Sequence, residues 1–147
     1  MSEHVSPFPA LTIRIVYEDF PHFMQFEARI VVGDWSGITW ADHDPESVSE
    51  SARDLLAWTA SPLEGFGFEF GTAAGQGWLS LRFYQIDRAG HVACHLQLAT
   101  KVEPSRPEGV RRLALEFSTE PALVERFARQ LAALAETLTG EAILTGI

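Results

Sequence analysis

The sequence predicts an α+β fold: a single antiparallel β-sheet of about six strands, with two amphipathic helices packed on one face. Three observations predict it. Apolar and polar residues alternate along several short segments, turn-forming residues separate those segments, and two longer segments have the apolar periodicity of helices. Strands, helix, strands and helix follow one another without a linker. We therefore expect residues 1–147 to form a single domain.

The N-terminal third predicts an arm, a strand pair and a short third strand. Residues 1–10 contain prolines and polar residues and are expected to form the arm. Apolar side chains alternate with polar ones over residues 11–17 and again over residues 23–32, which indicates two strands. After a turn at residues 33–37, residues 38–40 are expected to pair back as a hairpin.

The first helix has two possible starts, about one turn apart. Asp44 followed by Pro45 fits an N-cap and a first helical position. Ser47 with Glu50 fits a capping box instead. The apolar face has helical spacing and consists of Val48, Ala52, Leu55, Leu56 and Thr59. Ser61-Pro62 is expected to end the helix.

The remaining strands come as hairpins. Residues 66–70, 78–86 and 91–101 alternate as strands do, and a further strand centres on residues 113–117. Asp87-Arg88-Ala89-Gly90 suits a hairpin turn, because glycine accepts a positive φ.

The final helix is expected to open at Pro121 and to end at Gly140. Its apolar stripe is broad and consists of Leu123, Val124, Phe127, Ala128, Leu131, Leu134, Ala135 and Leu138. The C-terminal tail, residues 141–147, is apolar enough to dock on the domain or to add a short strand.

Composition limits the function. Eleven Lys and Arg against twenty Asp and Glu give a formal charge of −9, which argues against a nucleic-acid partner because backbone binding needs clustered cations. We see neither a secretory signal nor an apolar stretch near the ~20 residues of a membrane span. One cysteine, Cys94, cannot form an internal disulfide, so we expect a cytoplasmic protein without a membrane partner.

Candidate catalytic and metal-binding residues have simpler explanations. On a strand, His91 and His95 lie about 13 Å apart, too far for two ligands of one zinc at about 2.1 Å each. Asp42-His43-Asp44 suits a helix cap and its first-turn acids. Cys94 alternates into the core, where it acts as a small hydrophobe. We therefore expect no catalytic residue, no metal and no cofactor.

The glycine-rich segment Gly71–Gly77 superficially resembles a phosphate-binding loop. It lacks the Lys-Ser or Lys-Thr of a P-loop, and a strand rather than a helix follows it. We interpret it as a turn between strands.

The sheet face opposite the helices is the most informative surface. Alternation places a mixed set of side chains there: Arg14, Gln25, Glu27, Arg29, Trp78, Arg82, Tyr84, His91, His95, Gln97, Arg112 and Glu116. Trp, Tyr and Arg dominate the energetic centres of protein interfaces. Our interface candidates are Arg29, Trp78, Arg82, Tyr84, His91, His95 and Arg112. An ordinary solvated face with cross-strand charge pairs is the alternative.

The order of elements resembles the WapI-type immunity proteins of bacterial contact-dependent toxin systems and allied uncharacterised bacterial families. The matching stretches are the early strand pair ending at Trp40, then Asp54–Trp58, Trp78–Arg82 with Gly90–Val92, Leu113–Phe117, and finally Leu123, Phe127 and Leu131. The Glu-Pro-Asn stretch that the family has after its first helix is replaced by Phe68-Glu69-Phe70-Gly71.

The resemblance implies a non-catalytic protein that binds and blocks a partner toxin, so a protein partner is our first hypothesis. A basic toxin such as a nuclease would be attracted by the acid excess. The alternatives are a small-molecule-binding protein or enzyme with a pocket between sheet and helices, involving Trp40 and Trp58, and a homodimer formed by the open sheet face or an edge strand.

Overall fold

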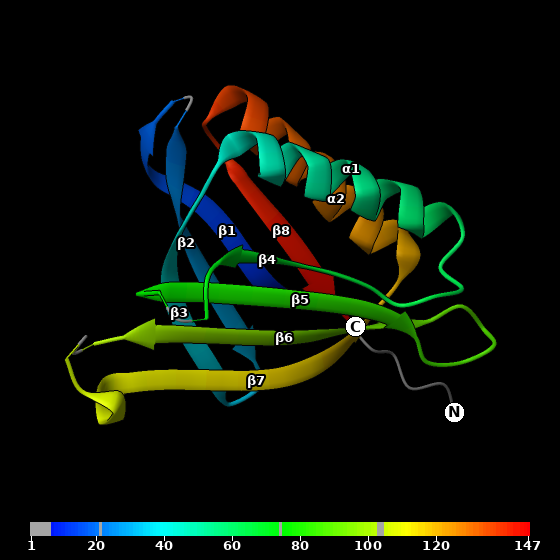
Figure 1. The fold of residues 1–147 in the computed structure, drawn as a ribbon. Coiled ribbons are helices and arrows are strands. Elements are labelled where there is room, and N and C mark those ends of the chain that lie inside the picture. The colour runs from blue at the N-terminus through cyan, green and yellow to red at the C-terminus, as the bar shows by residue number, and fades with distance from the viewer. Residues whose placement is uncertain (1–6, 21, 74, 103–104) are drawn as a thin grey trace.

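The structure is a computed structural model that describes residues 7–20, 22–73, 75–102 and 105–147. These residues form eight strands, two α-helices and one turn of 3-10 helix at Pro107–Gly109 (Figure 1). The strands are β1 (Phe8–Asp19), β2 (Phe23–Val32), β3 (Trp35–His43), β4 (Phe66–Gly71), β5 (Gly77–Gln85), β6 (Val92–Lys101), β7 (Val110–Thr119) and β8 (Glu141–Gly146). The helices are α1 (Pro45–Ala60) and α2 (Pro121–Thr137). The α+β class is confirmed.

The strands form two antiparallel sheets rather than one. Sheet A has the order β3-β2-β1-β8 and sheet B the order β4-β5-β6-β7, with four strands in each. The prediction of a single sheet of about six strands is therefore wrong. Alternation shows which side chains share a face of a strand but not which strands are neighbours. Helix α1 separates β3 from β4, so these strands are not joined by a hairpin and belong to different sheets.

Both ends of the described chain add to sheet A. Strand β1 begins at Phe8, inside the stretch for which the sequence predicts an arm, and residues 1–6 lie outside the described residues. The C-terminal tail forms β8, which pairs antiparallel with β1 so that Leu11 lies opposite Leu144. Both leucines are fully buried, because this edge of sheet A faces α2. The tail thus takes the second of its two expected roles and adds a strand.

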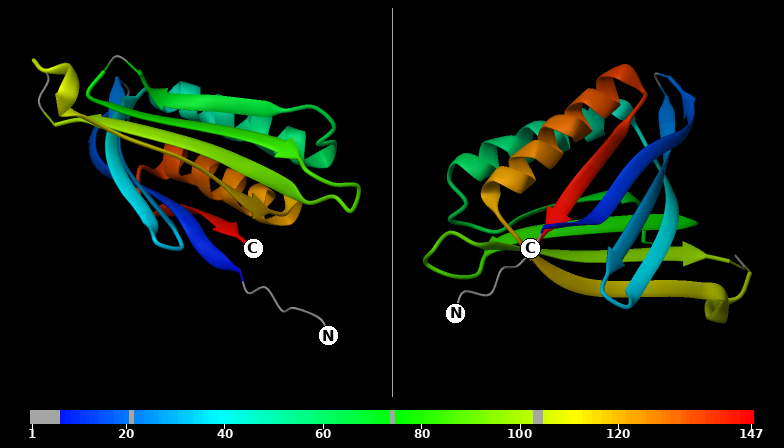
Figure 2. Two further views of the ribbon diagram at one scale, coloured as in Figure 1. Left: turned by 90° about the horizontal axis from the view of Figure 1, so that it is seen from below. Right: turned by 180° about the vertical axis from the view of Figure 1, so that it is seen from behind.

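The two sheets cross, and their inner faces share one hydrophobic core (Figures 1 and 2). Phe26 of sheet A stacks on Phe70 of sheet B, with ring centroids 5.2 Å apart. Strand β3 passes over sheet B, where the buried Thr39 hydroxyl donates to the Ala99 carbonyl at 2.9 Å. Gly77, which begins β5, lies directly against the Trp40 carbonyl oxygen. Residues distant in the sequence thus fix how the sheets meet.

The helices lie side by side across the angle between the two sheets (Figure 2), instead of covering one face of a single sheet. Helix α1 starts at the first of its two expected positions: the Asp44 carboxylate accepts a hydrogen bond from the Ser47 backbone N–H at 2.9 Å, and Pro45 is the first helical residue. The Trp58 ring of α1 packs on Phe83, at 5.8 Å between centroids. Helix α2 packs on β8 and on α1.

Gly77 tests the crossing of the sheets. A Cβ at this position would overlap the Trp40 carbonyl oxygen, and neither backbone can move without separating β3 from β5. We expect Gly77→Ala to lower the free energy of unfolding by more than about 2 kcal/mol in urea titrations. Gly65→Ala is the control, since a Cβ added at Gly65 would lie 3.6 Å from its nearest neighbour, the Phe83 carbonyl oxygen, which is an ordinary contact distance. Equal stability of the two variants would contradict the observed contact.

His43 joins β3 to the end of β4. Its Nδ1 accepts a hydrogen bond from the Gly71 N–H at 3.4 Å, and its ring meets the Phe70 ring edge-on at 5.2 Å between centroids. Burial lowers the pKa of His43 below its usual value, and the adjacent Asp44 only partly opposes this effect. The folded protein therefore favours the neutral imidazole.

The lowered pKa of His43 makes the stability of the fold depend on pH. Because the His43 pKa is lower in the folded state than in the unfolded chain, where it is about 6.5, the unfolded state binds more protons as the pH falls. We expect stability to decrease from about pH 7.5 to pH 5, and His43→Asn to flatten this slope by keeping an acceptor that cannot be protonated. His22→Asn, at an exposed position, is the control. An unchanged slope in His43→Asn would contradict the assignment.

Candidate protein-binding surfaces

The outer face of sheet B carries most of the residues that the sequence assigns to an interface. Alternation along β5 sends Leu81 and Phe83 into the core and leaves the side chains between and beside them outside. Arg82 lies opposite His95 on β6, which lies opposite Glu116 on β7. We call this surface the B face, and it consists of Trp78, Ser80, Arg82, Tyr84, His95, Gln97, Arg112, Ala114 and Glu116.

Contacts within the B face hold its side chains in place. The Tyr84 hydroxyl donates to the Glu116 carboxylate, and this hydrogen bond is the main reason why the pKa of Tyr84 is raised. The Arg82 guanidinium lies 5.5 Å from the centre of the Tyr84 ring, within cation–π range. His95 Nε2 and Gln97 Nε2 are 3.1 Å apart. Side chains that are already ordered lose less conformational entropy when a partner binds.

The seven interface candidates do not share one face, because the expected single sheet is two sheets and because β6 begins at Val92, after His91. Arg29 lies on the outer face of sheet A. His91 lies in the turn before β6, where its Nδ1 is 2.6 Å from an Asp87 carboxylate oxygen. Trp78 is half-buried beside Ala99. The other candidates all lie on the B face, namely Trp78, Arg82, Tyr84, His95 and Arg112.

On sheet A, a half-buried carboxylate orders the outer face. Arg14 donates to both oxygens of Glu27, at 3.1 and 3.0 Å, and Arg29 lies 3.8 Å away. The pKa of Glu27 is lowered chiefly by the hydrogen bonds from Arg14, and the side chain of Trp40, its cross-strand partner, also donates to it. The polar edge of the Trp40 indole is therefore satisfied, while the residue remains 44% exposed.

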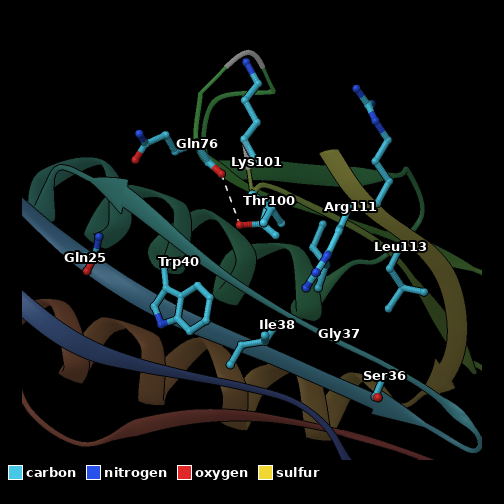
Figure 3. Close-up of a pocket in the computed structure, with 13 residues that line it drawn as sticks. Gln25, Ser36, Gly37, Ile38, Trp40, Gln76, Thr100, Lys101, Arg111 and Leu113 are labelled. Carbon is cyan, nitrogen blue, oxygen red and sulfur yellow. Dashed lines mark hydrogen bonds between the residues drawn. The ribbon is translucent and has the colours of Figure 1, made fainter. Parts of the chain in front are cut away.

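A groove of about 630 Å³ lies where β3 passes the ends of β6 and β7 (Figure 3). Trp40 and Ile38 line it from β3, whereas Lys101 and Arg111 come from the other two strands. The full lining is Gln25, Ser36, Gly37, Ile38, Trp40, Gln76, Leu98, Thr100, Lys101, Val102, Arg111, Arg112 and Leu113. Arg112 belongs to both the groove and the B face, so the two surfaces are continuous.

Sequence reasoning missed the groove because its walls come from different sheets. The available signals were Trp40, on the short strand predicted at residues 38–40, and the consecutive pair Arg111-Arg112. Neither signal by itself predicts a groove, because Trp40 and the two arginines come together only through the crossing of the sheets.

The residues considered for chemistry have structural roles here. Asp44 caps α1 and His43 packs on Phe70. Cys94 is fully buried, and burial raises the pKa of its thiol far above the usual range, which suppresses the nucleophilic thiolate. Within residues 7–20, 22–73, 75–102 and 105–147, no group of three His, Cys, Asp or Glu side chains is placed to hold a metal ion.

The glycine-rich segment joins two strands, as interpreted from sequence, because Gly71 ends β4 and Gly77 begins β5. Trp58, expected with Trp40 in one pocket, lies in the core instead, and its indole N–H donates to the Glu64 carbonyl at 2.5 Å. No helix in the described part of the chain is long and apolar enough to cross a membrane.

Comparisons with known proteins do not assign the chain to a family: no protein-family model, no curated protein and no solved structure matches it.

Two substitutions on β5 test the orientation of this strand. Leu81 points into the core, so Leu81→Ala is expected to cost about 2–5 kcal/mol of unfolding free energy. Tyr84 lies on the outer face, so Tyr84→Ala is expected to cost no more than about 1 kcal/mol. Urea titrations of both variants measure the difference. A Tyr84→Ala protein that unfolds as readily as Leu81→Ala would show that the B face is not an outer surface.

Proposed function

We propose that the protein is a non-catalytic binding protein that recognises a protein partner through the B face. The observation that supports this proposal is the ordered set of side chains on an outer sheet face, which consists of Arg82, Tyr84, His95 and Glu116. Tyr and Arg provide large contact areas together with hydrogen bonds and charge, which is why they are frequent at the energetic centres of interfaces.

The specific form of this function that we propose is immunity: the protein binds a toxin domain in the cytoplasm and blocks it. The resemblance in element order to WapI-type immunity proteins supports this, as does the formal charge of −9. Glu46, Glu50 and Asp54 are exposed along α1, so the acid excess is available to attract a basic domain such as a nuclease. Attraction of this kind raises the association rate and weakens with added salt.

A small-molecule-binding function is the second candidate, and the groove favours it. A volume of about 630 Å³ is within the range of ligand sites, and Gln25, Gln76 and Thr100 supply polar groups near Trp40. This site lies between the two sheets rather than between sheet and helices. Thermal-shift screening against metabolites separates the candidates, because a specific metabolite would raise the melting temperature of wild type and not of Trp40→Ala.

Co-expression tests the immunity proposal. The candidate toxin is the C-terminal domain of the protein encoded by the neighbouring gene. This domain is expressed in a bacterial host with and without the proposed immunity protein. We expect the domain to arrest growth alone and wild type to restore growth. Arg82→Ala/Tyr84→Ala is expected to weaken the complex by at least about tenfold in calorimetry, since both residues belong to the ordered set of the B face.

Arg126→Ala/Arg129→Ala on α2 is the control, because both side chains lie on a helix away from the B face. Growth arrest that wild type does not relieve, with no complex in calorimetry, would contradict immunity to that domain. Loss of binding in the α2 control but not in the B-face variant would show that the B face is not the interface. Light scattering of the free protein separates a homodimer from a monomer.

A further inference from the structure

The groove has two chemically different sides. Trp40 and Ile38 on β3 give it an apolar side, with Trp40 44% exposed. Lys101 and Arg111 give the other side positive charge (Figure 3). Arg112 also lines the groove. No carboxylate is among the described residues that line it. In a chain with a formal charge of −9, a lining whose described residues include three cationic side chains and no carboxylate is a local reversal of charge.

The two arginines of the groove have no carboxylate partner among the described residues, unlike Arg14 and Arg129. Arg14 binds Glu27 and Arg129 binds Glu125, so these charges are matched within the protein. Within the part of the chain that the structure describes, neither Arg111 nor Arg112 forms an ion pair, and both are exposed. Their guanidinium groups can therefore bind carboxylates of a partner in a bidentate manner.

The shape of the groove fits an extended segment better than an enclosed small anion. Lys101 and Arg111 extend outward from the rim, instead of converging on one point (Figure 3). Strand β7, which carries both arginines, pairs with β6 and with no other strand of the described chain. An edge strand offers backbone N–H and C=O groups, to which an extended peptide can add with its side chains alternating between apolar and polar surroundings.

We infer that the groove binds a short acidic segment of the protein partner, with carboxylates on Arg111 and Arg112 and an apolar side chain against Trp40. This inference rests on the proposed protein-binding function and names the chemistry of the recognised segment. A protein segment is favoured over a nucleic acid because the overall charge of −9 repels a long polyanion, whereas a segment with two or three carboxylates senses mainly the nearby cations.

Peptide selection on the wild-type protein tests the inference, because it needs no identified partner. Displayed random peptides about twelve residues long are selected on the protein and then measured as synthetic peptides by fluorescence anisotropy. We expect Asp- and Glu-rich sequences with one aromatic or aliphatic residue. We expect affinity to fall at least about tenfold in Trp40→Ala and in Arg111→Glu/Arg112→Glu, and to weaken with added salt.

Arg126→Glu/Arg129→Glu is the matched control, because it changes the net charge equally at positions of α2 outside the groove. Circular dichroism melts confirm that each variant is folded. The inference is overturned if no peptide is enriched, if enriched peptides lack acidic residues, or if the groove and α2 variants lose equal affinity. It is also overturned if a labelled single-stranded RNA binds wild type but not the groove variants, or if light scattering shows self-association that only the groove variants abolish.

The two proposals fail separately. If Trp40→Ala, which alters the groove and leaves the B face unchanged, binds a toxin domain as wild type does while Arg82→Ala/Tyr84→Ala does not, the groove inference is wrong and the binding function stands. If acidic peptides need the groove but no neighbouring toxin domain is bound, immunity is wrong and the groove is a peptide site for another protein.

Discussion

The contact between β3 and the start of β5 is the constraint on which the rest of the structure depends. A side chain at Gly77 would leave no room for the Trp40 carbonyl, and the adjacent Thr39 hydroxyl bonds the main chain of β6. These contacts set the crossing of the sheets, which in turn leaves the open angle that α1 and α2 fill. The same crossing places Trp40 opposite β7 and so creates the groove.

Local features of the fold could be predicted from sequence because they depend on neighbours in the chain. The cap at Asp44 and the inward side of β5, marked by Leu81, are both observed as expected. The sheet arrangement could not be predicted in the same way. Strand β8 pairs with β1 through contacts such as Leu11 with Leu144, which no local pattern encodes. Long-range pairing is decided by the packing of the whole core.

The candidate surfaces show the same division. Arg82, Tyr84 and His95 share a face because strand alternation requires it, and that part of the interface prediction needs only the sequence. Arg29 was grouped with them because all strands were assigned to one sheet, and His91 because the predicted strand over residues 91–101 began before β6 does. The groove depends on the meeting of two sheets, so its chemistry becomes visible only when both walls are in place.

The negative charge of the whole protein and the positive charge of the groove act over different distances. The acid excess, exposed along α1, determines the field that an approaching domain meets, and salt screens this field beyond about 8–10 Å. Arg111 and Arg112 act only at contact, where they favour carboxylates. A basic partner with one acidic segment would satisfy both, whereas a uniformly basic protein would bring cations against the groove. Under the proposed function such a mismatch would disfavour wrong partners, and the polarised surface would provide specificity in addition to attraction.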